Sequence, residues 1–391
     1  MNKDYKSKIK ALLKRYRILY RIYFFVMTAF VNVVKLFVRP DEKLLLFVSF
    51  GGRRFTDSPK SIYDFMRKDS RFSDYKLVCG LLNPIDYPSI EKKVKLDTLA
   101  YYITALKARC WITNVSIERG LGFKGKKTYY LYTGHGSPIK KCGVDENNNN
   151  HYHAAAKSLF DASLAQSEFE KKIRSRLMCL SEDKVYLTGA PTNDILANYD
   201  DTYRTSIRLD LGIKDGKKAI LYAPTFREYR NVGTFDTPDV NFEKWHHLLG
   251  PDYVILYRAH PIAMTDNMTN NDWFIDVTKY NSIEPLMIAS DILVSDYSGL
   301  IPDYSIMHKP IYLWTYDYEQ YEEARGLYFD IRKVLPYAER EEELLQMIKD
   351  GYTDTQKEAI IKFQQKYATV YGSATENAVD LIYRNINENE K

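Results

Sequence analysis

Cysteine is scarce in this sequence, and its few cysteines are not paired. Among 391 residues the four cysteines stand at positions 79, 110, 142 and 179, so no two of them form a C-x-x-C motif. Scattered cysteines argue against a disulfide framework and against a zinc site, and they favour a reducing compartment. No other metal-ligand cluster is visible, and we expect neither a tightly bound metal nor a cofactor.

A long apolar segment is also missing. The N-terminal run without charge, residues 22–34, has 13 residues, which is fewer than the ~20 that a helix needs to cross a bilayer. No small-residue cleavage site follows this run, which argues against a signal peptide.

Positive charge is concentrated in the arm formed by residues 1–40. Residues 1–39 hold ten Lys or Arg and one Asp, a net charge of +9, whereas the whole chain carries +5. The remaining chain is therefore acidic, which argues against nucleic-acid binding. A basic segment followed by a short apolar run predicts an interfacial helix on an anionic membrane surface. A helix packed on the protein's own surface and a true membrane span stay open as alternatives.

After residue 40 the chain alternates between strand-like and helix-like segments. A length of 391 residues is too great for one core, and two successive βαβ series predict two doubly wound α/β domains that face a cleft. The first domain is expected at 41–197, and the second, with a helical tail, at 198–391. The expected strands are 44–49, 76–82, 110–115, 128–133, 160–165 and 185–188, followed by 218–223, 253–258, 274–277, 292–294 and 310–314.

A polar turn follows one of the strands of the second series. Ser295-Asp-Tyr-Ser-Gly299 comes directly after an apolar strand and precedes a predicted helix at 300–307. Free backbone N–H groups, hydroxyls and a glycine at the carboxyl edge of a parallel sheet are typical of a phosphate site. Ser298 is the better phosphate donor, because the carboxylate of Asp296 would repel a diphosphate.

Another strand ends in Tyr257-Arg-Ala-His-Pro261. Arg258 and His260 are two residues apart and therefore point to the same face of an extended segment. An arginine and an imidazole on one face suit the oxygen atoms of a pyrophosphate.

A glycine lies on each side of His135 in Thr133-Gly-His-Gly-Ser137. The two glycines let the backbone turn sharply and leave the imidazole uncovered. A histidine at a strand end can act as general base toward a hydroxyl nucleophile, although a lone histidine is more often a simple hydrogen-bonding residue.

Together these motifs resemble those of the CDP-glycerol glycerophosphotransferase family, the teichoic acid primases and polymerases of Gram-positive bacteria. The resemblance covers roughly residues 44–330 and implies the two-domain GT-B architecture. His135 matches the histidine of the family's Trp-His-Gly-Thr-Pro-Leu-Lys motif, which is implicated in catalysis. This sequence departs from that motif at Gly134, Ser137 and Ile139.

The resemblance also implies roles for further residues. It implies that Thr225 and Arg227 bind the donor diphosphate together with the turn at 295–299, in which Gly299 replaces a serine. The late segment with Arg325 and Gly326 is a further candidate for the diphosphate. The remaining implied roles are His260 as a catalytic residue beside His135, and Asp57, Gly136, Ser137 and Lys140 on the acceptor side. Asp57 could equally cap the helix that begins near Pro59.

The implied reaction moves glycerol phosphate from CDP-glycerol to a hydroxyl of an undecaprenyl-linked glycan, a teichoic acid or a capsule polymer, and releases CMP. The enzyme would work as a peripheral protein on the cytoplasmic face of the cell membrane. CDP-ribitol as donor, a GT-B nucleotide-sugar glycosyltransferase and an inert membrane scaffold stay open as alternatives. Single addition or polymerisation, and the oligomeric state, are not determined by the sequence.

Overall fold

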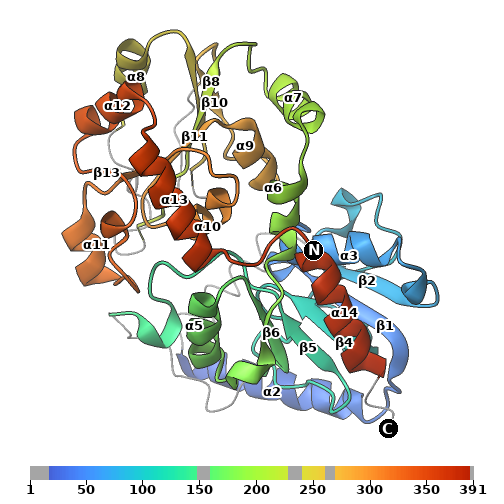
Figure 1. Ribbon diagram of the computed structural model, residues 1–391. Coiled ribbons are helices and arrows are strands. Elements are labelled where there is room, and N and C mark those ends of the chain that lie inside the picture. Colours follow the sequence, from blue (N-terminus) through green and yellow to red (C-terminus); the bar gives the residue numbers. More distant parts are fainter. Residues whose placement is uncertain (1–16, 148–158, 228–239, 260–268, 388–391) are drawn as a thin grey trace. The chain divides into compact units, whose positions relative to one another are not determined.

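The computed structural model describes residues 17–147, 159–227, 240–259 and 269–387 (Figure 1). They form two sheets, in which every neighbouring pair with a described register is parallel. The strand orders are β3-β2-β1-β4-β5-β6-β7 and β10-β9-β8-β11-β12-β13. The predicted pair of βαβ series is therefore confirmed.

The strands of the first sheet are β1 (Asp41–Val48), β2 (Lys76–Leu81), β3 (Lys93–Lys95), β4 (Ala108–Thr113), β5 (Tyr129–Tyr132), β6 (Ala162–Ala165) and β7 (Val185–Leu187). Those of the second are β8 (Lys218–Tyr222), β9 (Tyr253–Tyr257), β10 (Phe274–Asp276), β11 (Ile292–Ser295), β12 (Ile311–Trp314) and β13 (Tyr337–Ala338). Strands β3 and β13 are absent from the prediction, because three and two residues are too few for a visible pattern.

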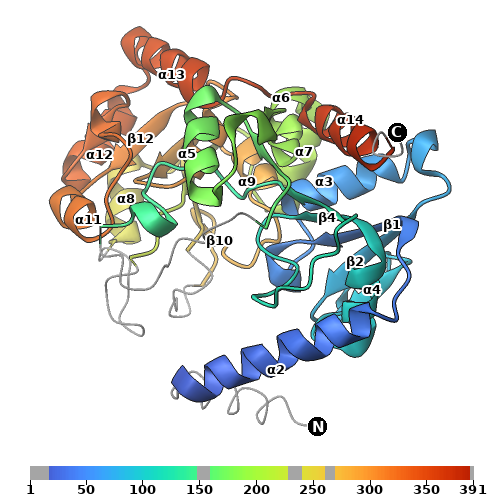
Figure 2. The ribbon, with the colours of Figure 1, turned by 90° about the horizontal axis from the view of Figure 1, so that it is seen from below.

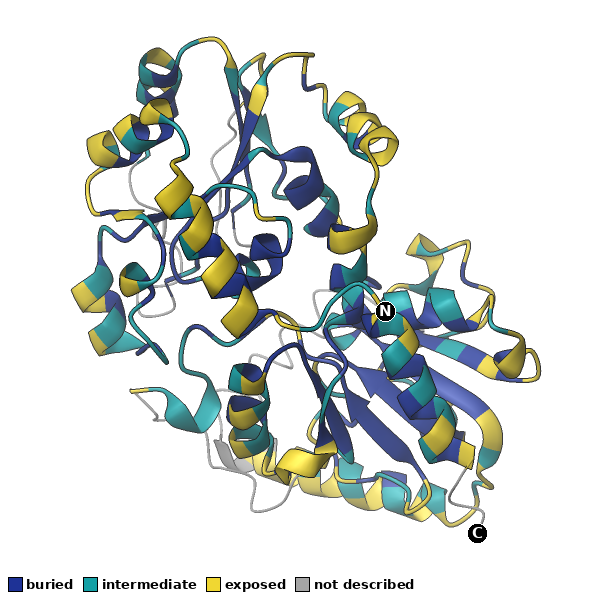
Figure 3. Ribbon diagram, viewed as in Figure 1, coloured by how far each residue is buried: buried dark blue, intermediate teal, exposed yellow. Residues whose placement is uncertain are grey.

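The described helices cover the sheets and expose their outer sides, whereas most strand residues are buried (Figure 3). They are α2 (Arg17–Lys35), α3 (Asp57–Met66), α4 (Leu99–Lys107), α5 (Glu168–Met178), α6 (Asp194–Asn198), α7 (Asp201–Asp210), α8 (Phe242–Leu249), α9 (Glu284–Ala289), α10 (Leu300–Ser305), α11 (Tyr318–Ala324), α12 (Glu341–Asp350), α13 (Asp354–Tyr367) and α14 (Ala374–Asn387).

The chain divides into two compact units, and the division does not follow the two sheets. The first unit comprises residues 1–55, 63–132 and 379–391, and the second comprises 56–62 and 133–378. Strands β1–β7 lie within the predicted first domain and β8–β13 within the second, but the segment from Thr133 onward packs with later residues. The tail returns to the first unit, where the Arg109 guanidinium donates to the carbonyl of Ile386 at 2.9 Å.

Helix α2 packs one face on the first unit, beside α4 and the segment 120–124 (Figure 2). Val31 is fully buried, Asn32 Nδ2 donates to the carbonyl of Gly122 at 3.2 Å, and Lys35 Nζ donates to that of Lys124 at 2.7 Å. The other face exposes large apolar side chains, which are Leu19, Ile22, Tyr23, Phe25, Val26, Phe30 and Val33. Of the helices that the structure describes, none has the length and apolar character needed to cross a membrane.

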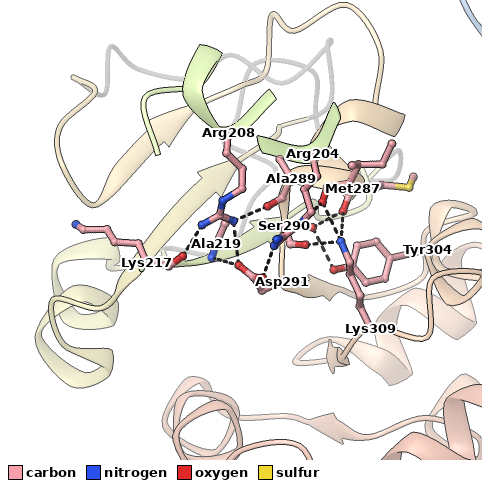
Figure 4. A network of polar contacts seen from close by, with 11 residues as sticks. Arg204, Arg208, Lys217, Ala219, Met287, Ala289, Ser290, Asp291, Tyr304 and Lys309 are labelled. Carbon is pink, nitrogen blue, oxygen red and sulfur yellow. Dashed lines mark hydrogen bonds and ion pairs between the residues drawn. The ribbon is translucent and has the colours of Figure 1, made fainter. Parts of the chain in front are cut away.

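An ion-pair network ties helices to the amino edge of the second sheet (Figure 4). Asp291, which precedes β11, pairs with Arg204 at 2.5 Å and with Arg208 at 3.1 Å, and it accepts from the backbone N–H of Ala219 at 2.8 Å. Lys309 Nζ donates to three carbonyl groups around the end of α9. We call this group, Arg204, Arg208, Asp291 and Lys309, the amino-edge network.

Burial and the nearby Arg204 lower the pKa of Lys309, whereas its three carbonyl acceptors favour the charged ammonium.

Candidate functional site

The turn after β11 is joined to the turn after β8 by side-chain hydrogen bonds. The Ser295 hydroxyl donates to the carbonyl of Ala223 at 2.7 Å. The Asp296 carboxylate accepts from the backbone N–H of Thr225 at 2.9 Å and from that of Tyr297 at 2.7 Å. The polar atoms of Ser295 and Asp296 are engaged in these bonds, so the two buried residues fix the two turns.

Arg227 lies at the centre of a buried charge cluster. Its guanidinium pairs with Asp296 at 2.7 Å and with Asp317 at 2.7 and 2.9 Å. Burial opposes the charge of Arg227, but the two carboxylates outweigh this effect and raise its pKa. The rings of Tyr297 and Tyr321 lie 5.2 and 5.0 Å from the guanidinium carbon. We call Arg227, Asp296 and Asp317 the carboxyl-edge cluster.

This placement differs from the expectation that Arg227 contacts the donor diphosphate. Its exposed fraction is 0%, and its donors are engaged by carboxylates and by the carbonyl of Thr225. The physical reason is Asp317, a residue 90 positions away in the sequence that the fold brings to the guanidinium. Arg227 therefore links the turns that carry Thr225, Asp296 and Asp317.

Two buried hydroxyls beside this cluster have no hydrogen-bond partner in the described structure. They are Oγ1 of Thr225, which follows β8, and Oγ1 of Thr315, which follows β12. Nearly all buried polar groups in proteins are hydrogen-bonded, so two such hydroxyls at one sheet edge suit a polar ligand. Thr225 was expected in the donor site from the sequence, whereas Thr315 was missed.

Arg258 and Ser298 are half-buried at the same sheet edge. The Arg258 guanidinium donates to the carbonyl groups of Val277 and Tyr280 at 3.3 and 3.0 Å. The Ser298 hydroxyl accepts from the backbone N–H of Leu300, at the start of α10, at 3.4 Å. His260, the expected partner of Arg258, lies outside the described residues.

The segment with His135 lies directly against the turn after β11. The backbone N–H of Ser137 donates to the carbonyl of Gly299 at 3.3 Å. A side chain at Gly299 would place its Cβ 2.6 Å from the carbonyl oxygen of Ser137, which explains the glycine at this position. His135 and Gly136 are exposed. Ser137 and Gly299 are 162 positions apart in the sequence, so the structure brings two distant motifs together.

A buried amide network supports this approach. The Ser137 hydroxyl accepts from the Gln166 amide, which also donates to the Asp303 carboxylate at 2.7 Å. The Asn193 amide donates to the same carboxylate oxygen at 2.7 Å. Burial raises the pKa of Asp303 to about 7. Sequence reasoning missed Gln166, Asn193 and Asp303, and the available signal was an acidic residue inside the apolar stretch 300–307.

Arg325 and Gly326 hold the segment that follows His135. Arg325 Nε donates to the carbonyl of Lys141 at 2.9 Å, and the guanidinium pairs with Glu146 at 3.0 Å. The carbonyl of Gly326 accepts from the backbone N–H of Lys141 at 2.9 Å, and the backbones of Lys140 and Leu327 form an isolated antiparallel β-bridge. Arg325 thus supports the segment after His135, and its expected contact with the diphosphate stays a prediction.

Asp57 has an unusual backbone conformation at the start of α3. Its φ is 64°, a value that non-glycine residues seldom adopt outside special sites, and its carboxylate accepts from the backbone N–H of Ser58 at 2.5 Å. The Ser58 hydroxyl in turn accepts from the backbone N–H of Thr192 at 3.3 Å. Capping of α3 and orientation of an acceptor both fit this placement. No group of metal-binding side chains was found in the described ranges.

Comparison with known proteins gives concordant matches. The sequence profile of the CDP-Glycerol:Poly(glycerophosphate) glycerophosphotransferase family matches residues 30–384. A curated protein described as teichoic acid glycerol-phosphate transferase, from Staphylococcus aureus (strain NCTC 8325 / PS 47), is 30% identical over 370 residues, which cover 88% of this chain and 94% of that protein.

Two solved structures resemble this protein in fold. A histidine-to-asparagine variant of the wall teichoic acid polymerase TagF, soaked with CDPG, is 26% identical with a TM-score of 0.81, over 97% of this chain and 99% of that chain. The UDP-GlcNAc 2-epimerase from Neisseria meningitidis is 13% identical with a TM-score of 0.53, over 87% and 99%. The second likeness concerns the fold alone, and together they confirm the expected GT-B-like fold class.

Proposed function

The chain belongs to the CDP-glycerol:poly(glycerophosphate) glycerophosphotransferase family, and we propose that it transfers glycerol phosphate from CDP-glycerol to a hydroxyl of a teichoic acid acceptor. The observation that carries this proposal is the contact between Ser137 and Gly299. It sets the exposed histidine of one motif beside the phosphate-type turn of another. A base for a hydroxyl and a set of donors for a diphosphate are what this reaction needs.

In the proposed reaction the acceptor hydroxyl attacks the distal phosphorus of CDP-glycerol. A bond forms between the hydroxyl oxygen and that phosphorus, and the bond from that phosphorus to the bridging oxygen breaks, so that CMP leaves. His135 takes the proton of the hydroxyl. Arg258, Ser298 and His260 stabilise the charge that develops on the diphosphate, because fixed donors are most effective where charge appears in the transition state.

The remaining residues have supporting roles in this proposal. The hydroxyl of Thr225 faces the donor, whereas Arg227, Asp296 and Ser295 hold the turns. Arg325 and Gly326 hold the segment that carries Lys140. Gly136, Ser137 and Asp57 lie on the acceptor side.

One assay tests the donor assignment. The purified protein is incubated with a teichoic acid acceptor and, separately, with CDP-glycerol, CDP-ribitol or UDP-sugars, and the released nucleotide is measured. We expect release of CMP with CDP-glycerol. Release with CDP-ribitol alone would move the assignment to the ribitol donor, and release of UDP would move it to glycosyl transfer.

A second assay tests the role of His135. We expect His135→Ala to lower turnover with CDP-glycerol by ~10²-fold or more, the usual contribution of a positioned base. Donor affinity, measured by calorimetry, should change little because the base acts on the acceptor. Wild-type turnover in the folded variant would remove His135 from the mechanism.

We also propose that the enzyme acts on a lipid-linked acceptor as a peripheral membrane protein. The support is the exposed apolar face of α2, which begins in the basic arm. Phe25 is 76% exposed and Phe37, just beyond the helix, is 82% exposed. Side chains of this kind enter the interface of a bilayer, and basic residues bind its anionic headgroups.

Binding to anionic vesicles tests the membrane proposal. Phe25→Ser with Phe37→Ser should weaken sedimentation with vesicles of phosphatidylglycerol, and wild-type binding should fall as salt rises. The control is Leu209→Ser, which removes a side chain with 77% exposure from α7 in the second unit. Equal vesicle binding by all three proteins would rule out this face of α2.

A further inference from the structure

The backbone of Gly134, directly before His135, lies against a buried cation. A Cβ at this position would lie within 1.9–2.3 Å of the guanidinium atoms of Arg174. No side chain fits between the two residues, so the guanidinium of Arg174 occupies the volume that a side chain at position 134 would fill. The φ of Gly134 is 77°, a value that glycine adopts without strain.

The guanidinium of Arg174 is held in place by two elements. Its Nη1 donates to the carbonyl of Leu164 in β6 at 2.7 Å, and its Nη2 pairs with Glu170, one turn earlier in α5. Both side chains are more than nine-tenths buried. Arg174 cannot swing away without losing these bonds inside the protein, where an unpaired charge is costly.

Glu170 is itself fixed at the start of α5. Its backbone N–H donates to the hydroxyl of Ser167, the N-cap residue, at 3.2 Å, and its carboxylate accepts from the backbone N–H of Gln166 at 2.8 Å. The side chain of Gln166 reaches Ser137 on the other side of His135. The segment 134–137 is therefore supported at one end by Arg174 in α5 and at the other by Gln166, which directly precedes the N-cap of α5.

We propose that Arg174 is a positioning residue for His135. Its guanidinium fills the space that a side chain at position 134 would take, and it thereby fixes the backbone of Gly134. This inference rests on the proposed role of His135 as general base. A displacement of about 1 Å can cost a large factor in rate when a catalytic group must meet its substrate in one geometry. The pair of Gly134 and Arg174 thus sets the position of the imidazole without contact to substrate.

The test compares two alanine substitutions at glycines with similar φ. Gly134→Ala adds a methyl group against the guanidinium, whereas Gly216→Ala, at φ 79°, adds one where nothing lies within 4 Å. The two variants thus have a similar φ at the substituted residue, but only Gly134→Ala brings its methyl group into collision with a side chain. We expect Gly134→Ala to lower kcat with CDP-glycerol by ~10-fold or more and to change KM by less than ~3-fold, and Gly216→Ala to keep wild-type kcat.

A double-mutant cycle then asks whether the loss comes from Arg174. The background variant is E170Q/R174A, which removes the cation and neutralises its partner so that no buried carboxylate stays unpaired. In this background the methyl group of Gly134→Ala meets no guanidinium, and we expect its effect on kcat to shrink to that of Gly216→Ala. An equal kcat loss in both backgrounds, or a loss that only follows the folded fraction, would overturn the proposal.

A second readout separates this inference from the proposed function. The rate at which diethyl pyrocarbonate modifies His135, followed by peptide mass mapping, reports the local setting of the imidazole without any substrate. We expect Gly134→Ala to change this rate in the wild-type background but not in E170Q/R174A. If the wild-type protein released no CMP, the proposed function would fail, whereas an unchanged modification rate in every variant would refute the positioning role.

Discussion

The amino-edge network and the carboxyl-edge cluster use the same residue types at opposite edges of one sheet. In the amino-edge network Asp291 is 32% exposed, and its arginine partners also donate to backbone carbonyl groups. In the carboxyl-edge cluster the side chains of Arg227, Asp296 and Asp317 are at most 5% exposed.

The difference between the two edges separates support from function. The amino-edge groups bind the chain's own helix ends, and the structure needs nothing else to explain them. At the carboxyl edge the charged side chains hold two turns, and the hydroxyls of Thr225 and Thr315 have no hydrogen-bond partner among the described residues. Buried charges are weak evidence for stability, because their desolvation offsets their attraction, but they can hold one conformation. We infer that only the carboxyl edge is prepared for a ligand.

The largest expected effect follows from removal of the buried cation. Arg227→Met should lower the free energy of unfolding by ~3–5 kcal/mol, because two buried carboxylates lose their partner. Urea denaturation at pH 7 measures this change. A loss below ~1 kcal/mol would show that water reaches these carboxylates and that the two edges do not differ as described.

The pH dependence of stability distinguishes Asp303 from both arginine groups, since arginine keeps its charge near neutral pH. The pKa of Asp303 rises from 3.8 to about 7 on folding, so the folded state binds the proton more tightly. The free energy of unfolding should therefore fall as pH rises from about 4 to about 7, on the order of 4 kcal/mol. Asp303→Asn should flatten this part of the urea-denaturation profile, and an unchanged slope would contradict the assignment.

A moderate effect is expected at the amino edge. Asp291→Ala removes two partly exposed ion pairs and one backbone contact, and we expect a loss of ~1–2 kcal/mol in the free energy of unfolding. Turnover with CDP-glycerol per folded molecule should stay at the wild-type value. Impaired turnover in a well-folded variant would link this network to the reaction.

The smallest effect on stability is expected at the unpartnered hydroxyls. Thr225→Val keeps the shape of the side chain and removes a hydroxyl that has no hydrogen-bond partner among the residues the structure describes, so stability should change by less than ~0.5 kcal/mol. Affinity for CDP-glycerol, measured by calorimetry, should fall by ~0.5–1.5 kcal/mol if the hydroxyl binds the donor. Thr315→Val provides the same comparison at the end of β12. Unchanged affinity for CDP-glycerol in both variants would show that neither hydroxyl binds the donor.

Much of the fold could be predicted because strand and helix patterns are local. The buried strands appear as apolar runs, and the predicted ranges 44–49 and 292–294 lie close to β1 and β11. The predicted helical tail contains α13 and α14, which are separated by residues 368–373, where Gly372 has a φ of 87°. The domain boundary after residue 197 stays a prediction. It lies between the last strand of the first sheet and the first strand of the second, whereas the compact units divide the chain after Tyr132.

The sequence by itself determined which turns follow which strands, because polar residues after an apolar run mark a strand end. Only the tertiary structure decided which charged groups those turns expose. Arg227 is a good phosphate ligand by type, but its guanidinium donates to Asp317, which lies in a distant part of the chain. Gly134 and Gly299 have the same explanation: one is opposed by Arg174 and the other by Ser137. Contacts between residues far apart in the chain depend on the folded arrangement, and a local pattern carries no information about them.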